Sequence, residues 1–312
     1  MHVAGPRRAS SYRLPLFPGT VIGDGFMRDP AHTRSVGLLL AAALCWSLAG
    51  VLFKYVALSG LAAAAGRGLI AGAFLVALSW RSLRFTWSPL QLGAALAYAS
   101  CTLLFAMANK LTTAANAILL QYTAPIWAAL FGAWLLREHP RRSDWVTIAV
   151  VLSGLGLFLY DGLQVGQLAG VLLATASGIG FGLLPVLIRK QPEGSALEAI
   201  ILGNLLCAAV GIPALLAAPA LPATGWLALA TLGVVQLGLS YFFYARAVRH
   251  VTALEAVLIP VLEPVLNPVW VMLAVGERPT PLSLVGGAIV LGAVTIRAIV
   301  SIRRPAGRPQ VP

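Results

Sequence analysis

Ten long apolar stretches, separated by short basic segments, limit what this chain can fold into. A helix needs about 20 apolar residues to cross a hydrocarbon core of about 30 Å. Of the 312 residues, 59% are hydrophobic and only 10% are charged, which is more apolar surface than a soluble domain of this size can bury. We therefore predict an all-α integral membrane protein with ten transmembrane helices, at 36–57, 61–80, 89–109, 112–136, 143–160, 167–188, 196–216, 224–245, 252–275 and 281–300.

The basic residues are divided unevenly between the two sides of this arrangement. If the N-terminus is cytoplasmic, 18 of the 22 Lys and Arg residues lie in inner segments and Arg67 lies within a span; the outer loops hold only Lys54, Lys110 and Arg278. Such an excess of positive charge marks the cytoplasmic side. We expect a multi-pass protein of the cell (inner) membrane with both termini cytoplasmic. The positive charge also attracts membrane lipids, and no nucleic acid is expected as a partner because no soluble domain is present to bind it.

The two ends of the chain are basic and contain several prolines. Residues 1–35 include no apolar core segment, so we expect a cytoplasmic tail there and no signal peptide. Met27, which closely precedes the first span, is an alternative start. We expect residues 301–312 to form a second cytoplasmic tail.

Two distant segments repeat one pattern, which indicates an internal duplication. The stretch TTAANAILLQYTAPIWAALFGAWLLREHP is echoed 139 residues later by VTALEAVLIPVLEPVLNPVWVMLAVGERP. In this register Pro125 pairs with Pro264, and Glu138 pairs with Glu277. A proline inside an apolar run, followed at the same distance by Glu-x-Pro, is difficult to obtain twice by chance.

Each half of the chain, 36–160 and 167–300, contains five of the predicted spans. Because five is odd, the second half must enter the bilayer in the opposite sense from the first. Such inverted repeats support alternating access in transporters. We expect the fifth and tenth spans to lie at the periphery, where they are a candidate surface for a homodimer.

With these halves in place, the chain resembles the EamA-type drug/metabolite transporter superfamily, and within it the bacterial amino-acid and metabolite exporters. This resemblance implies a secondary transporter without a cofactor, which exports small metabolites such as aromatic and neutral amino acids by alternating access through a central cavity between the repeats. The residues that carry the resemblance are Ala114, Ala117, Pro125, Glu138, Ala253, Ala256, Glu263, Pro264, Glu277 and Arg278, together with Trp46 and Arg67.

The run PVLEPVLNP is the most unusual part of the second half. Pro260, Pro264 and Pro268 lack the N–H donor of a normal helix residue, and in hydrocarbon such backbone is tolerated only against protein or a watery cavity. Glu263 lies in this run near mid-membrane, where an ionised carboxylate costs about 2.5–3.5 kcal/mol. We expect it to sense a proton gradient. The alternative is a kinked packing helix in which Glu263 only hydrogen-bonds a freed carbonyl.

The substrate pathway is predicted from aromatic and polar side chains within the spans. We expect backbone carbonyls of 252–275 to hold the ammonium group of a zwitterion, helped by Gln121, Tyr98 or Asn267. The predicted pathway residues are Trp46, Tyr98, Gln121, Tyr122, Pro125, Tyr244, Glu263, Pro264, Asn267 and Trp270.

Arg67 and Glu198 are candidates for an ion pair or a gate. Arg67 is the only basic residue well inside a span. It could bind a substrate carboxylate, or it could extend outward and cap carbonyls near Glu277 or Asp161. We favour the second interpretation. Glu198 occupies the pseudo-symmetric place in the second half, which indicates matched architectural ion pairs.

Two other functions are open to a chain of this class. A nucleotide-sugar or sugar-phosphate exchanger should carry several intramembrane cations to hold phosphate, and only Arg67 qualifies. An intramembrane enzyme, the more remote alternative, should have a buried His beside a Ser, or two Asp in mid-span. The four histidines fall in the predicted tails and loops, and the three cysteines each stand alone within a span, so neither catalysis nor a metal site is expected.

Overall fold

The computed structural model describes residues 30–112, 114–160, 168–191, 196–276 and 281–303. All regular structure in these residues is helical. The first half comprises α1 (Pro30–Trp46), α2 (Ala49–Tyr55), α3 (Gly60–Ser79), α4 (Pro89–Leu111), α5 (Ala114–Gln121), α6 (Ala124–Phe131), η1 (Gly132–Leu136) and α7 (Arg142–Tyr160). The second comprises α8 (Leu168–Lys190), α9 (Ala196–Leu216), α10 (Ala223–Thr231), η2 (Leu232–Leu239), α11 (Ser240–Ala247), η3 (Val248–His250), α12 (Ala253–Leu258), η4 (Ile259–Val261), α13 (Leu262–Val275) and α14 (Pro281–Arg303).

The length and composition of these helices support a membrane protein. Within the described residues, seven helical segments are long and apolar enough to cross a bilayer: Pro30–Tyr55, Gly60–Ser79, Pro89–Leu111, Leu168–Lys190, Ala196–Leu216, Ala223–His250 and Ala253–Ala274. Two further apolar helices, Ala124–Leu136 and Leu284–Arg297, are shorter. The predicted spans 112–136, 143–160 and 281–300 are therefore not among the seven, and the count of ten spans stays a prediction.

Glycines set how closely the central helices approach one another. A Cβ atom on Gly180 of α8 would lie 2.8 Å from the carbonyl oxygen of Ala97 in α4. A Cβ on Gly178 would lie 2.8 Å from the Gln121 carbonyl oxygen, and one on Gly182 would lie 2.7 Å from the Ala124 carbonyl oxygen. These glycines, of which Gly178 and Gly182 are four residues apart, therefore let α8 pack directly on α4, α5 and α6.

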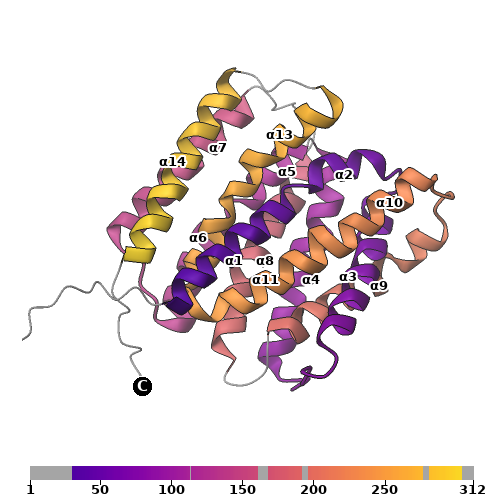
Figure 1. Cartoon of the computed structure of the whole chain (residues 1–312), viewed down its shortest axis with the longest axis horizontal. Coiled ribbons are helices and arrows are strands. Elements are labelled where there is room, and N and C mark those ends of the chain that lie inside the picture. Colours follow the sequence, from indigo (N-terminus) through magenta and orange to yellow (C-terminus); the bar gives the residue numbers. More distant parts are fainter. Residues whose placement is uncertain (1–29, 113, 161–167, 192–195, 277–280, 304–312) are drawn as a thin grey trace, which may run out of the picture.

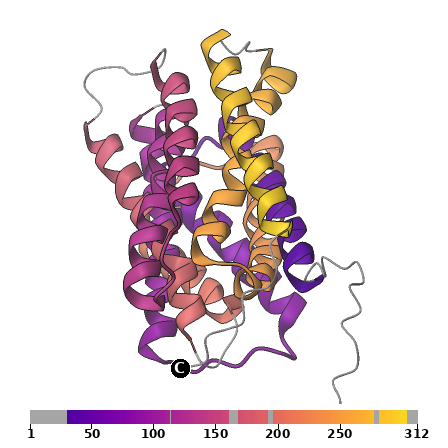
Figure 2. The same ribbon diagram turned by 90° about the vertical axis from the view of Figure 1, so that its left-hand side faces the viewer.

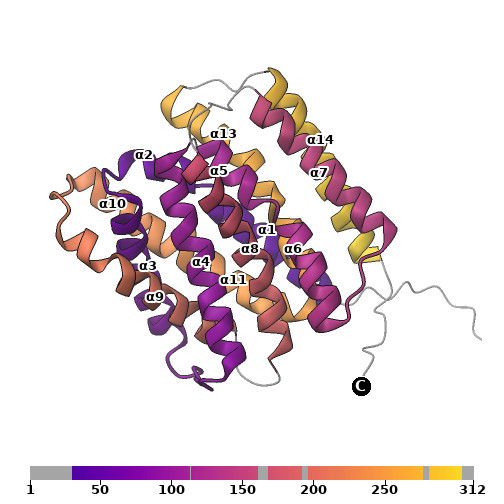
Figure 3. The same cartoon turned by 180° about the vertical axis from the view of Figure 1, so that it is seen from behind.

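The helices α7 and α14 form a pair along one edge of the bundle, on the left in Figure 1 and on the right in Figure 3. Figure 2 faces this edge and shows the two helices running side by side. Their contact is close, because a Cβ atom on Gly154 would lie 2.8 Å from Cγ2 of Val290. These are the fifth and tenth predicted spans, and their place at the edge agrees with the expected periphery.

Besides the short 3-10 turn η3, two segments of the second half depart from regular α-helix. The prolines interrupt the span 252–275, where the 3-10 turn η4 separates α12 from α13. Between α10 and α11 the chain forms the π-helix η2, which contains Gln236. Such π segments inside helices are frequent at functional sites. Gln236 and Leu237 of η2 line the cavity described next, and so does Glu263, which lies in the first turn of α13 directly after η4.

Candidate functional site

The bundle contains a small, partly open cavity with a volume of about 30 Å³. Of its lining residues, six precede residue 160 and five follow residue 168, so both halves of the chain build it. The lining residues are Trp46, Arg67, Cys101, Thr102, Phe105, Gln121, Phe181, Gln236, Leu237, Tyr241 and Glu263.

Arg67 of α3 is held inside this cavity by neutral partners. Its Nη2 donates to the carbonyl oxygen of Thr102 at 2.8 Å, and its Nη1 donates to Oε1 of Gln236 at 3.3 Å. The guanidinium also lies 5.1 Å from the centre of the Phe53 ring. No carboxylate of the described residues lies within 4.0 Å of it, and its Nε has no hydrogen-bond partner. The cavity therefore contains a buried cation without a counter-ion from the described chain.

The favoured interpretation of Arg67, in which it extends outward to cap carbonyls near Glu277 or Asp161, stays a prediction, because the structure describes only its interior contacts. The side chain is only 1% exposed, because Thr102 and Gln236 offer it acceptors in the interior. The proposed outer partners Glu277 and Asp161 lie outside the described residues, as does Arg278. Glu198 does not pair with Arg67. It accepts the backbone N–H of Arg84 at 2.6 Å, at the turn between α3 and α4.

Glu263 takes part in a short hydrogen-bonded chain. The hydroxyl of Tyr122 lies 2.7 Å from Oε2 of Glu263 and 3.0 Å from the carbonyl oxygen of Pro260. Pro264 has no N–H to donate to that carbonyl, so the tyrosine replaces a missing helix donor. One hydroxyl hydrogen cannot serve two acceptors fully. If Glu263 is protonated, it donates to Tyr122 and Tyr122 donates to Pro260, and the whole chain is satisfied.

Aromatic rings form one wall of the cavity. The Trp46 ring lies 4.9 Å from that of Tyr241, 5.6 Å from that of Tyr244 and 5.9 Å from that of Phe181, measured between centroids. The Tyr98 ring packs behind Tyr241 at 4.7 Å. The indole Nε1 of Trp46 and the hydroxyl of Tyr244 are buried without a hydrogen-bond partner. The wall therefore consists mainly of apolar ring surface, but it also contains these two polar groups without a hydrogen-bond partner.

The predicted pathway residues fall into three groups in the structure. Trp46, Gln121 and Glu263 line the cavity. Tyr98, Tyr122 and Tyr244 are fully buried behind it, with the Tyr98 hydroxyl donating to Asn204 at 3.1 Å. The remaining residues do not line it: Pro125, Pro264, Asn267 and Trp270. Trp270 donates to the Ser47 hydroxyl at 2.8 Å, and the Asn267 side chain lies against Gly50.

Sequence reasoning missed Thr102 and Gln236, which hold Arg67 in place. Gln236 gave a usable signal, because it is one amide within the uncharged run LGVVQLGL. Thr102 gave none, since Thr is common in membrane helices and it acts here through its backbone carbonyl. The carbonyls of the span 252–275 were expected to hold an ammonium group, but that of Pro260 already accepts from Tyr122.

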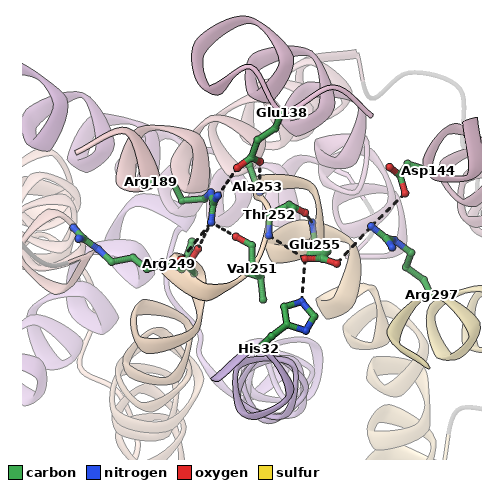
Figure 4. A network of polar contacts seen from close by, with 11 residues as sticks. His32, Glu138, Asp144, Arg189, Arg249, Val251, Thr252, Ala253, Glu255 and Arg297 are labelled. Carbon is green, nitrogen blue, oxygen red and sulfur yellow. Dashed lines mark hydrogen bonds and ion pairs between the residues drawn. The ribbon is translucent and has the colours of Figure 1, made fainter. Parts of the chain in front are cut away.

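A second polar cluster lies at the end of the bundle where α1 and α12 begin (Figure 4). We call it the inter-half network; its members are His32, Glu138, Asp144, Arg189, Glu255 and Arg297. Arg297 lies 3.2 Å from Asp144 and 3.6 Å from Glu255, and His32 Nε2 lies 3.3 Å from Glu255 Oε2. Arg189 pairs with Glu138.

Three of these four contacts join the two halves of the chain: His32 to Glu255, Glu138 to Arg189, and Asp144 to Arg297. His32 lies within α1 and not in a tail, because that helix begins at Pro30, earlier than the predicted span 36–57. The expectation that all four histidines lie in tails or loops is therefore wrong for His32.

The same network anchors the start of α12. The second carboxylate oxygen of Glu138 accepts the backbone N–H of Ala253 at 3.0 Å, and Arg189 donates to the carbonyl of Val251. Thr252 and Glu255 form a reciprocal capping box. Because α12 continues through η4 into α13, the network is connected by one helical segment to Glu263.

Comparisons with known proteins agree with this arrangement. The EamA-like transporter family matches residues 33–160 and again residues 168–298. The uncharacterized transporter YwfM of Bacillus subtilis (strain 168) is 28% identical over 279 residues, covering 83% of this chain and 92% of the relative. The pseudopaline exporter CntI of Pseudomonas aeruginosa (strain UCBPP-PA14) is 29% identical over 186 residues, covering 57% of this chain and 64% of the relative.

Solved structures share the fold, among them a crystal structure of a protein. It superposes with a TM-score of 0.73 at 21% sequence identity, covering 87% of this chain and 99% of the other. At that identity the likeness concerns the fold alone.

Proposed function

Because the chain belongs to the EamA-like transporter family, we propose that it is a secondary transporter that exports small metabolites, foremost amino acids, by alternating access. The observation that carries this proposal is the cavity, which both halves build and which contains one buried cation, one carboxyl group and an aromatic wall. The relative whose name describes an exporter supports the direction of transport.

The proposed architecture has ten spans in two inverted halves, with residues 36–160 in the first and residues 167–300 in the second. Both termini lie on the cytoplasmic side of the inner membrane. The excess of basic residues on that side supports this orientation. The outward faces of α7 and α14 are the proposed surface for a homodimer.

In this orientation the inter-half network lies at the cytoplasmic end, and we propose that it is the cytoplasmic gate. Alternating access requires the halves to separate at one end while they close at the other. Ion pairs that join the halves must break when that end opens. Asp144, Glu255 and Arg297 are each 5 or 6% exposed, so their contacts are little screened by solvent.

The cavity lining argues against a transporter of phosphorylated sugars. Among the cavity-lining residues that the structure describes, Arg67 is the only Lys or Arg. A phosphate carries about two negative charges near pH 7 and is usually held by several cationic donors. The named relatives are transporters, which supports transport and not catalysis as the role of the chain.

We expect purified protein in liposomes to exchange labelled neutral and aromatic amino acids in counterflow. The measurement is uptake of a labelled amino acid into vesicles that contain the same unlabelled amino acid, with empty liposomes as the control. Uptake of a labelled sugar phosphate, with none of any amino acid, would overturn the amino-acid proposal in favour of an exchanger.

Cysteine labelling in whole cells tests the orientation. We expect a membrane-impermeant thiol reagent, added outside, to label Gly162→Cys and Ala220→Cys and to leave Ser82→Cys unlabelled. The native Cys45, Cys101 and Cys207 are replaced by Ala in the background. The proposed topology is wrong if Ser82→Cys is the variant that reacts.

A further inference from the structure

Two residues that line the cavity carry hydrogen-bond donors that the protein does not use. Arg67 Nε and Trp46 Nε1 are buried and have no hydrogen-bond partner, and both residues line the cavity. Arg67 is 1% exposed and Trp46 is 3% exposed. Neither nitrogen can accept a hydrogen bond, so only an acceptor can satisfy them. Buried donors without partners are rare in native proteins, and a pair of them in one cavity indicates a ligand group that accepts.

The other charged group of the cavity has the opposite chemistry. Glu263 receives the Tyr122 hydroxyl on Oε2, while Oε1 has no partner among the described residues. Arg67 and Glu263 line the same cavity but are not paired with each other within 4.0 Å. When Glu263 is ionised, a ligand that carries a single charge would pair with one of these groups and leave the other buried without an opposite charge, which is costly in a low-dielectric site.

Both charges are satisfied together only by a ligand that has an anionic and a cationic end. We propose that Arg67 and Trp46 bind the carboxylate of a small zwitterionic amino acid and that Glu263 binds its ammonium group. This inference rests on the proposed transport function and adds the groups that select the substrate. The cavity-lining rings of Phe105, Phe181 and Tyr241 then contact the apolar side chain of the ligand.

Competition with matched analogues tests the inference in the intact protein. Phenylalanine carries both charges, phenethylamine lacks the carboxylate, and 3-phenylpropionate lacks the amine. We expect phenylalanine to displace a labelled neutral amino acid from the purified protein, and each analogue to bind roughly 10- to 100-fold more weakly, as the loss of one charged hydrogen-bonded group implies.

Two variants connect this selectivity to the named donors. In Arg67→Gln we expect phenylalanine to lose its advantage over phenethylamine while the penalty on 3-phenylpropionate remains. Trp46→Phe keeps the ring, removes only the N–H, and should weaken phenylalanine binding while leaving phenethylamine unchanged. Lys110→Gln removes an exposed cation outside the cavity and is the matched control. If Arg67→Gln does not fold, the competition measurement with Trp46→Phe alone tests the proposal.

The outcomes separate this inference from the proposed function. Equal competition by phenylalanine and phenethylamine in the unchanged protein would overturn the zwitterion site, although transport would stand. It would also be overturned if folded Arg67→Gln or Trp46→Phe bound phenylalanine and the two analogues with the same relative affinities as the unchanged protein. Failure of the unchanged protein to bind or exchange any amino acid would instead defeat the proposed function itself.

Discussion

Replacing Glu263 by Gln is expected to make transport independent of pH and of an imposed proton gradient. In the unchanged protein, a proton and the substrate ammonium group compete for the same carboxylate. Substrate binding should therefore tighten as the pH rises and Glu263 ionises, and weaken as the pH falls and Glu263 takes up a proton. The amide of Gln cannot titrate, and it can donate to Tyr122 permanently, as the protonated acid does.

The measurement is counterflow and gradient-driven uptake in liposomes at pH values from about 5.5 to 8.5, because carboxyl groups buried in proteins can have pKa values as high as about 8–9. We expect Glu263→Gln to bind amino acid roughly tenfold more weakly and to give a flat pH profile. Tyr122→Phe is the matched control, because it removes the hydroxyl but keeps the carboxyl group, and its transport should still depend on pH. If transport by Glu263→Gln depends on pH in the same way as transport by the unchanged protein, Glu263 is a structural residue.

Replacing Arg297 by Gln is expected to open the cytoplasmic end of the transporter. The change removes one partner from Asp144 and Glu255, which are both buried. Removing one partner of a buried ion pair typically costs about 3–5 kcal/mol. The change destabilises the closed state, in which the pair forms. It destabilises the open state far less, because water reaches the carboxylates there. The population should therefore shift toward the inward-open state.

Cys101, which lines the cavity, reports this shift. In inside-out vesicles with Cys45 and Cys207 replaced by Ala, we expect a polar thiol reagent to modify Cys101 at least tenfold faster in Arg297→Gln, since tenfold corresponds to about 1.4 kcal/mol. Arg142→Gln, an exposed basic residue at the start of α7, is the matched control and should not change the rate. An unchanged rate in folded Arg297→Gln would show that the inter-half network is not the gate.

The sequence by itself determined the class of the protein and the residue most worth testing. Apolar stretches of span length must be buried in lipid or protein, and helices satisfy their backbone groups within the segment, so an all-helical membrane protein followed from composition and periodicity. Prolines act locally on the backbone, and this is why the break at η4 and the special position of Glu263 were predictable from PVLEPVLNP. The duplication was visible because paired Pro and Glu residues recur at a fixed distance.

Only the tertiary structure decided which polar side chains meet. The sequence of α3 does not name the partners of Arg67, and its position depends on an acceptor carbonyl in α4 and an amide in η2, distant in sequence. The contacts between the halves in the inter-half network join residues 51 to 223 positions apart, among them His32 and Glu255. Hydropathy and spacing describe one segment at a time, whereas an ion pair between helices depends on how the segments pack.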